Sequence, residues 1–99
     1  MNASVAIQVL PSVATNEELI PIVDAAIDYI RSFNLNMEVG PFETTIEGDY
    51  DTLMEIVNGC AKVCEEAGSP GTMVYVKINY SDEGVLTMEE KVTKHRLEE

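Results

Sequence analysis

The 99-residue chain, with 45% hydrophobic residues, has the size and composition of one folded domain with its own core. Its formal net charge of -12 repels phosphate backbones and anionic lipid surfaces, so we expect neither nucleic acid nor membrane as a partner. The sequence has no signal-peptide pattern or membrane-length apolar run, and its two cysteines lie four residues apart. We therefore expect a cytoplasmic protein with reduced thiols.

Apolar alternation over residues 5–10 predicts a first strand. A capping-box pattern from Thr15 to Glu18 then precedes apolar residues at three- and four-residue spacing through Phe33, which predicts a helix. Because proline lacks an N–H and suits only the first turn of a helix, Pro21 places the expected start near Glu18 or the residue before it.

The middle of the chain predicts a hairpin and a second helix. Short strands over 36–39 and 44–47 flank the Gly40-Pro41 break. Asp49 or Asp51 is the expected cap of the following helix, whose apolar stripe ends before Gly68.

The last third predicts one strand and one polar helix. Residues 73–80 alternate clearly and form the most distinct strand of the chain. A second capping box, Thr87 with Glu90, predicts a helix over about 86–97 with few apolar anchors, among them Met88 and Leu97.

The predicted order is β-α-β-β-α-β with an additional C-terminal helix. This order is that of the α+β ferredoxin-like sandwich, a four-stranded antiparallel sheet with two helices on one face. We expect residues 1–99 to form this single domain.

Alternation along the strands separates two sheet faces. The helix-facing set is Val5, Ile7, Val9, Ile46, Val74, Val76 and Ile78. The opposite set is Gln8, Leu10, Thr45, Glu47, Tyr75, Lys77 and Asn79. On this second face Leu10, Tyr75 and either Met37 or Phe42 are expected to be partly exposed, which favours self-association. A buried Glu47 there would need a partner such as Lys77 or a bound cation.

The polar strand end with Thr44, Thr45 and Glu47 predicts a small-ligand site rather than a catalytic one. Its alternative is a solvated strand face, where threonine is common. The sequence contains no serine elbow, phosphate loop or zinc-protease motif, so no catalytic residues are assigned. Cys60 and Cys64 share an apolar helix face and are expected to be packing thiols, and no metal site is predicted.

Gly40-Pro41 followed by Thr44-Thr45-Ile46-Glu47-Gly48 resembles the small thiamine-binding proteins of the YkoF-like family. Similar runs are Ala6–Pro11, Lys77-Ile78-Asn79 and the tail Leu86–Lys94. The pair Phe42-Glu43 departs from the smaller residues common between Gly-Pro and Thr-Thr in this family.

The resemblance implies a ferredoxin-like homo-oligomer, a dimer or tetramer. It also implies thiamine or its hydroxymethylpyrimidine part as the ligand, with no further cofactor. The matching candidates for ligand binding are Thr44, Thr45 and Glu47, followed by Gln8 and Asn79. The expected function is non-catalytic binding that buffers, delivers or senses the vitamin. The alternatives are an assembly or regulatory protein without a small ligand, and an enzyme acting on a thiamine-like substrate.

Overall fold

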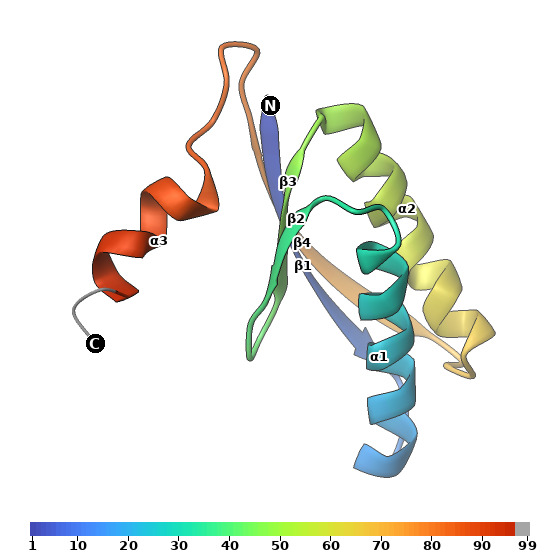
Figure 1. Ribbon diagram of the computed structural model, residues 1–99. Helices are drawn as coiled ribbons and strands as arrows, with labels where there is room; N and C mark the ends of the chain where they lie inside the picture. The colour runs from blue at the N-terminus through green and yellow to red at the C-terminus, as the bar shows by residue number, and fades with distance from the viewer. Residues whose placement is uncertain (97–99) are drawn as a thin grey trace.

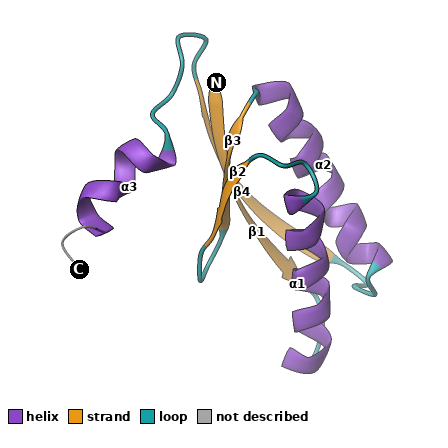
Figure 2. Cartoon of the chain, viewed as in Figure 1, coloured by secondary structure: helices purple, strands orange, loops and turns teal. Residues whose placement is uncertain are grey.

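The computed structural model describes residues 1–96, which form four strands and three helices. In chain order they are β1 (Ala3–Pro11), α1 (Asn16–Arg31), β2 (Asn36–Val39), β3 (Thr44–Gly48), α2 (Tyr50–Glu66), β4 (Thr72–Tyr80) and α3 (Met88–Arg96). Figure 2 shows this succession along the chain. The predicted final helix was expected to reach Leu97, which lies outside the described residues.

The four strands form one antiparallel sheet in the order β2-β3-β1-β4. Helices α1 and α2 cover one face, and α3 lies beside the opposite face (Figure 1). This arrangement confirms the predicted ferredoxin-like fold with an added C-terminal helix. We call the face away from α1 and α2 the open face.

The core lies between the sheet and the two covering helices, because inward residues of neighbouring strands are paired. Val5 of β1 pairs with Ile46 of β3, and both are completely buried against Leu53 of α2. Ile78 pairs with Val5 on the other side but is 49% exposed, since β4 is an edge strand. The predicted helix-facing parity is therefore correct, although Ile78 is not a core residue.

The start of α1 is fixed by its cap. The Thr15 hydroxyl accepts a hydrogen bond from the Glu18 N–H at 3.2 Å, as the capping box predicts. The helix begins at Asn16, so the predicted start near Glu18 was slightly late. Pro21 consequently lies in the second turn, on the exposed side of the helix, where solvent can satisfy the carbonyl that proline leaves without a donor.

Gly59 allows α1 and α2 to approach closely. A Cβ atom at this position would lie 2.0 Å from the hydroxyl oxygen of Tyr29 on α1. At the end of α2, Gly68 has φ +112°, as expected for the glycine that follows a helix. Asp49 occupies the N-cap position of α2 without a side-chain capping bond.

One residue lies on a different face from the one expected. Met37 pairs with Ile46 and packs against the helix-side core, so it is not on the open face. Its neighbours Asn36 and Glu38 point to the open face instead, because side chains alternate along β2.

Candidate functional site

The five predicted ligand residues lie on two faces of the sheet. Thr44 pairs with Ile7 and Val39, faces α1 and is only 5% exposed. Its neighbour Thr45 faces the open side, because adjacent strand residues alternate. The two threonines therefore cannot belong to the same wall of one pocket.

Glu47 lies on the open face and holds α3 in place. Its Oε1 accepts a hydrogen bond from the Asn36 side-chain amide at 2.6 Å, and its Oε2 accepts one from the Met88 N–H at 2.8 Å. The residue is 7% exposed. Lys77, one of the expected partners, pairs with Glu43 instead, and an amide side chain and the first N–H of α3 bond the Glu47 carboxylate.

The other predicted residues are spread across the open face. Thr45 lies between Ala6 and Glu38, whereas Asn79 pairs with Ser4 and is exposed on the edge strand. Gln8 pairs with Tyr75. These positions share a face with Glu47, as alternation predicted, but no single hollow brings all of them together.

The hollow that contains Thr44 is a cleft of about 100 Å³ between α1 and the β2–β3 turn, which we call the hairpin cleft. Its walls are mostly apolar: Ile7, Val9, Val23, Ala26, Ile27, Ile30, Val39, Pro41 and Phe42. The polar members are Gln8, Glu43 and Thr44. An apolar hollow with a few polar groups is the usual form of a small-molecule site.

The β2–β3 turn separates the hairpin cleft from a second hollow. This hollow, about 260 Å³, is lined by Glu38, Gly40, Pro41, Phe42, Glu43 and Thr45. The turn is closed by a hydrogen bond from the Gly40 N–H to the Glu43 carbonyl at 2.9 Å. Phe42 and Glu43 line both hollows and so form a wall between them.

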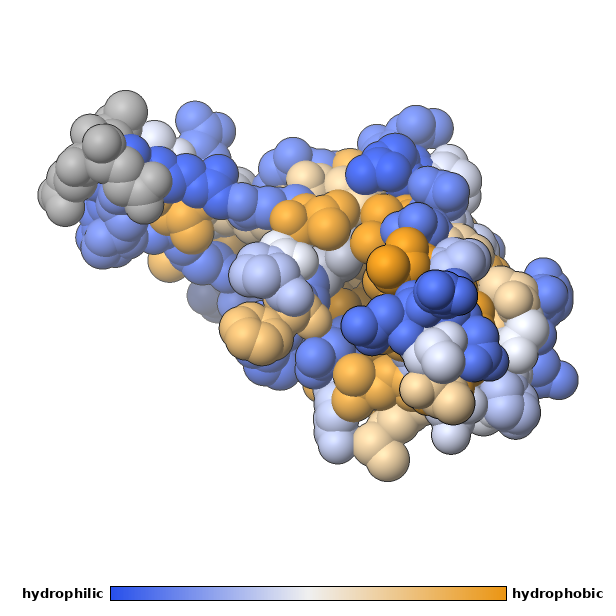
Figure 3. All heavy atoms as spheres, turned by 90° about the horizontal axis from the view of Figure 1, so that it is seen from below, coloured by the Kyte–Doolittle hydropathy of each residue, from blue (hydrophilic) through white to orange (hydrophobic). Residues whose placement is uncertain are grey.

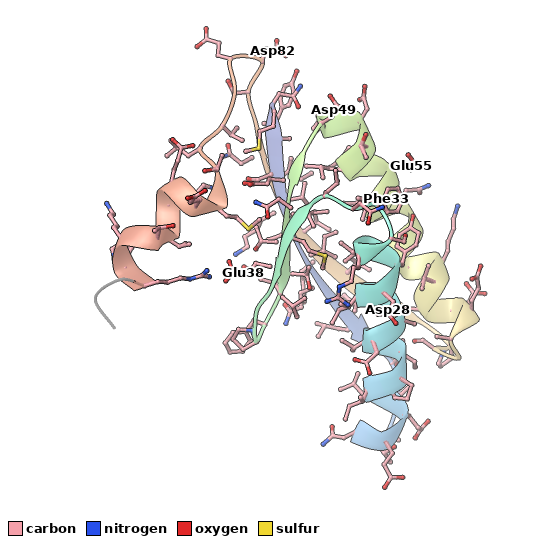
Figure 4. All side chains as sticks on the ribbon, viewed as in Figure 1. Asp28, Phe33, Glu38, Asp49, Glu55 and Asp82 are labelled. Atoms are coloured by element: carbon pink, nitrogen blue, oxygen red, sulfur yellow. The ribbon has the colours of Figure 1, made fainter. Side chains whose placement is uncertain are left out.

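The charged groups near the turn are paired. Lys77 reaches from β4 to the Glu43 carboxylate, with Nζ 2.9 Å from Oε1. Glu38 on β2 pairs with Arg96 of α3. Figure 4 shows Glu38 on the side of the sheet that carries α3.

The sequence interpretation named Phe42 or Tyr75 as a residue that could stack on a ligand ring, but it did not assign Glu43 or the α1 side chains to the site. The signal for the turn was present, since Phe42-Glu43 directly precedes Thr44 and departs from the resembling family. Ile27 and Ile30 carried no such signal, because they belong to an apolar stripe that any core-facing helix would show.

The two thiols lie away from the cleft. Cys60 and Cys64 are buried and free, and burial raises the pKa of the Cys60 thiol to about 11. A thiol that stays protonated is a poor nucleophile. Within residues 1–96 no group of His, Cys, Asp or Glu has the arrangement of a metal site. None of the helices there has the length and apolar character needed to cross a bilayer.

Similar proteins share both the sequence and the fold. A UPF0045 protein of Clostridium perfringens is 46% identical over 93 residues, which are 94% of this chain and 96% of that protein. A domain of unknown function, DUF77, from Bacillus cereus has a TM-score of 0.88 at 32% identity, covering 99% of this chain and 93% of that one.

A third relative is provisionally assigned to thiamine biosynthesis or salvage. This Thermotoga maritima structure has a TM-score of 0.86 at 34% identity, covering 97% of this chain and 100% of that one. The model of the family described as "Thiamine-binding protein" matches residues 5–96, which include the hairpin cleft and the Thr44–Gly48 strand. The chain belongs to the thiamine-binding protein family.

Proposed function

We propose that this protein binds thiamine, or its hydroxymethylpyrimidine part, without changing it chemically. The observation that carries the proposal is the hairpin cleft, an apolar hollow with the buried Thr44 in its wall. Thr44 begins the Thr-Thr-Ile-Glu-Gly strand on which the family resemblance rests. The family description and the provisional assignment of the Thermotoga maritima relative support the same vitamin.

The cleft has the size and chemistry for one aromatic ring. An apolar protein cavity of about 150 Å³ can hold benzene, and the hairpin cleft is of similar order at about 100 Å³, with an open mouth. A methylated aminopyrimidine presents an apolar face and several hydrogen-bonding atoms. The Thr44 hydroxyl can both donate to a ring nitrogen and accept from the amino group.

The charge of the protein supports a cationic ligand. Thiamine carries a permanent positive charge on its thiazolium ring, and the chain has a formal net charge of -12. Such a field raises the encounter rate of a cation in a salt-dependent way. It disfavours phosphorylated forms of the vitamin, whose negative charges would be repelled.

We further propose that the protein self-associates, as a dimer or tetramer, and acts in the cytoplasm to buffer, deliver or sense the vitamin. Leu10, Met73 and Tyr75 are exposed neighbours at one end of the open face, which supports contact with another copy. The ligand roles of Thr45, Glu47, Gln8 and Asn79 remain predictions. The roles of Thr45, Glu47 and Asn79 require a ligand on the open face, whereas Gln8 also lines the hairpin cleft.

Calorimetric titration tests the proposal with thiamine, hydroxymethylpyrimidine and thiamine phosphate. We expect micromolar binding of thiamine, about -8 kcal/mol, and weaker binding of the phosphate. Thr44→Val keeps the shape of the side chain but removes the hydroxyl, and should cost about 0.5–1.5 kcal/mol of binding free energy. The matched control, Thr93→Val, alters an exposed position of α3 that does not line the hairpin cleft. No heat with any compound from folded protein would reject the function.

The second candidate is an assembly or regulatory protein that binds only other proteins. The exposed apolar cluster of Leu10, Met73 and Tyr75 is the observation that favours it. This candidate predicts a melting temperature that rises with protein concentration and is unaffected by thiamine. A thiamine-dependent increase in melting temperature would contradict it.

A further inference from the structure

We infer that the turn residues Phe42 and Glu43 make the hairpin cleft selective for a charged two-ring ligand over the neutral pyrimidine alcohol. The inference rests on the proposed function and concerns the same site. It assigns a specificity role to two residues of the β2–β3 turn.

The first step is spatial. The cleft, about 100 Å³, has room for one ring, whereas thiamine has two rings joined by a methylene group. If the pyrimidine ring lies against Thr44, the thiazolium ring must lie at the mouth. The mouth is formed by the β2–β3 turn, and its Phe42 and Glu43 line the cleft directly.

The second step concerns charge. Among the residues that line the hairpin cleft, Glu43 is the acidic one, and its carboxylate lies at the turn, where it pairs with Lys77 of the open face. The Glu43 side chain keeps about a third of its surface exposed (33%), so it can contact a ligand at the mouth. Glu38, which lines the second hollow but not the hairpin cleft, is already paired with Arg96 on the open face. Glu43 is therefore the carboxylate placed to attract the thiazolium ring.

The third step is the competition with Lys77. Its ammonium group lies 2.9 Å from Glu43 and partly neutralises that carboxylate. Lys77 itself is largely exposed, so its ion pair with Glu43 is weak and easily exchanged. A cationic ligand at the mouth competes with Lys77 for the Glu43 carboxylate. Removal of Lys77 should therefore strengthen the binding of that ligand.

The fourth step is the aromatic ring of Phe42. This side chain is 79% exposed at the tip of the turn, where burial gives no reason for so large an apolar group. An exposed aromatic face attracts a planar cation through its quadrupole. Phe42 and Glu43 thus present two groups that favour positive charge on the same wall of the cleft.

Calorimetric titration of five variants separates charge selectivity from general binding. Each variant is titrated with thiamine and with hydroxymethylpyrimidine at low salt. Glu43→Gln should weaken thiamine binding about twofold to fivefold, the range of a partly exposed ion pair. Lys77→Gln should strengthen it about twofold to threefold by the same reasoning. Neither variant should change the affinity for the neutral alcohol by more than about twofold.

Two matched controls change the net charge by the same amount elsewhere. Glu83→Gln alters the β4–α3 loop at the far end of the sheet, and Lys62→Gln alters an exposed position of α2. Both should bind thiamine like the unmodified protein. Phe42→Leu, at an exposed site that tolerates substitution, should weaken thiamine binding about twofold to fivefold and leave the neutral alcohol unchanged.

The outcomes distinguish the two proposals. If the unmodified protein binds neither compound, the proposed function is wrong and this inference with it. If it binds both and Glu43→Gln leaves their affinity ratio unchanged, the selectivity role alone is overturned. Equal effects of Glu43→Gln and Glu83→Gln would also overturn it, because the net charge would then explain the change. A shifted ratio that 0.5 M salt abolishes supports the inference.

Discussion

The two faces of the sheet are held to their covering helices by different forces. Against α1 and α2 the sheet presents completely buried aliphatic side chains, Val5 and Ile46, packed on Leu53. On the open face α3 is held by the hydrogen bond from its Met88 N–H to Glu47, by the buried Met88 side chain and by the ion pair of its last residue with β2. The surface near the β2–β3 turn, seen from below in Figure 3, shows hydrophobic residues interspersed with hydrophilic ones.

The packing on the helix-covered face and the hydrogen bonds on the open face differ in how strictly they depend on geometry. Burial of aliphatic groups is non-directional and roughly proportional to area, so the helix-covered face tolerates small shifts. A carboxylate that accepts two hydrogen bonds requires both donors in place. Two neighbouring residues, Ile46 and Glu47, therefore test the two faces separately.

Ile46→Ala should produce the largest effect. It removes a completely buried side chain from the centre of the helix-side core and leaves a cavity. We expect the free energy of unfolding to fall by about 2–5 kcal/mol, measured by urea denaturation.

Ile20→Ala is the control, because this α1 residue is 57% exposed and should change the free energy by less than about 0.5 kcal/mol. A loss below about 1 kcal/mol for Ile46→Ala would mean that the core can collapse around the missing side chain. The contrast between the two faces would then be smaller than the burial indicates.

Glu47→Gln should release α3 without unfolding the sheet. The new amide can still accept from Asn36, but its NH₂ group cannot accept from the Met88 N–H. We expect a local cost of about 1–3 kcal/mol. Amide hydrogen exchange over α3 should accelerate, while exchange in β1 and α2 stays slow.

Glu89→Gln is the matched control, an exposed carboxylate on α3 itself, and should leave exchange unchanged. The Glu47→Gln variant also tests the predicted ligand role of Glu47. If Glu47→Gln lowers thiamine affinity while α3 stays protected, Glu47 contacts the ligand directly. Acceleration over the whole chain would instead show that both faces depend on this carboxylate.

Much of the fold could be predicted from the sequence because it rests on local patterns. Alternation placed Ile46 inward and Glu47 outward, and the capping box at Thr15 marked the start of α1. The exceptions depend on tertiary contacts. Pro21 was expected in the first turn, but the Thr15 cap sets the helix start, and Met37 was expected on the open face, but pairing with Ile46 turns it inward.

The candidate site was harder to predict. Thr44 and Thr45 were treated as one polar group, although strand alternation alone separates them onto opposite faces. The partners of Glu47 could not be predicted, since Asn36 and Met88 lie 11 and 41 residues away in sequence. Only the return of α3 to the open face brings Met88 there.

Cys60, in the core of the helix-covered face, should make the free energy of unfolding depend on pH. Desolvation by burial, and then the neighbouring Cys64, raise the pKa of the Cys60 thiol from its ordinary 9.0 to about 11. The unfolded chain loses this proton first, so the contribution of Cys60 to the free energy of unfolding should be constant below pH 9 and fall as pH rises from 9 towards 11. Urea denaturation at several pH values across this range measures the expected fall in the free energy of unfolding. Cys60→Ala should lower the free energy of unfolding at every pH and make it depend less on pH between 9 and 11. An unchanged pH dependence in this variant would mean that other groups cause the fall.

The smallest effect is expected on the open face at acid pH, where Glu90 completes the cap of α3. Glu90 accepts from the Thr87 N–H at 2.9 Å, and the Thr87 hydroxyl accepts from the Glu90 N–H at 3.0 Å. The hydrogen bond from the Thr87 backbone N–H, and then that from the Thr87 side chain, lower the pKa of the Glu90 carboxyl below its ordinary 4.5.

A lowered pKa means that the cap stabilises α3 above about pH 4.5 and that this stabilisation is lost as the pH falls and the carboxyl takes up a proton. Amide exchange over α3, corrected for its intrinsic pH dependence, should show less protection at pH 3.5 than at pH 6. The difference between the unmodified protein and Glu90→Gln should shrink over the same interval, because glutamine does not titrate. Since Glu90 is exposed, the change should be smaller than that from Glu47→Gln. Equal pH profiles for the two proteins would mean that Glu47, through the Met88 N–H, holds the start of α3 alone.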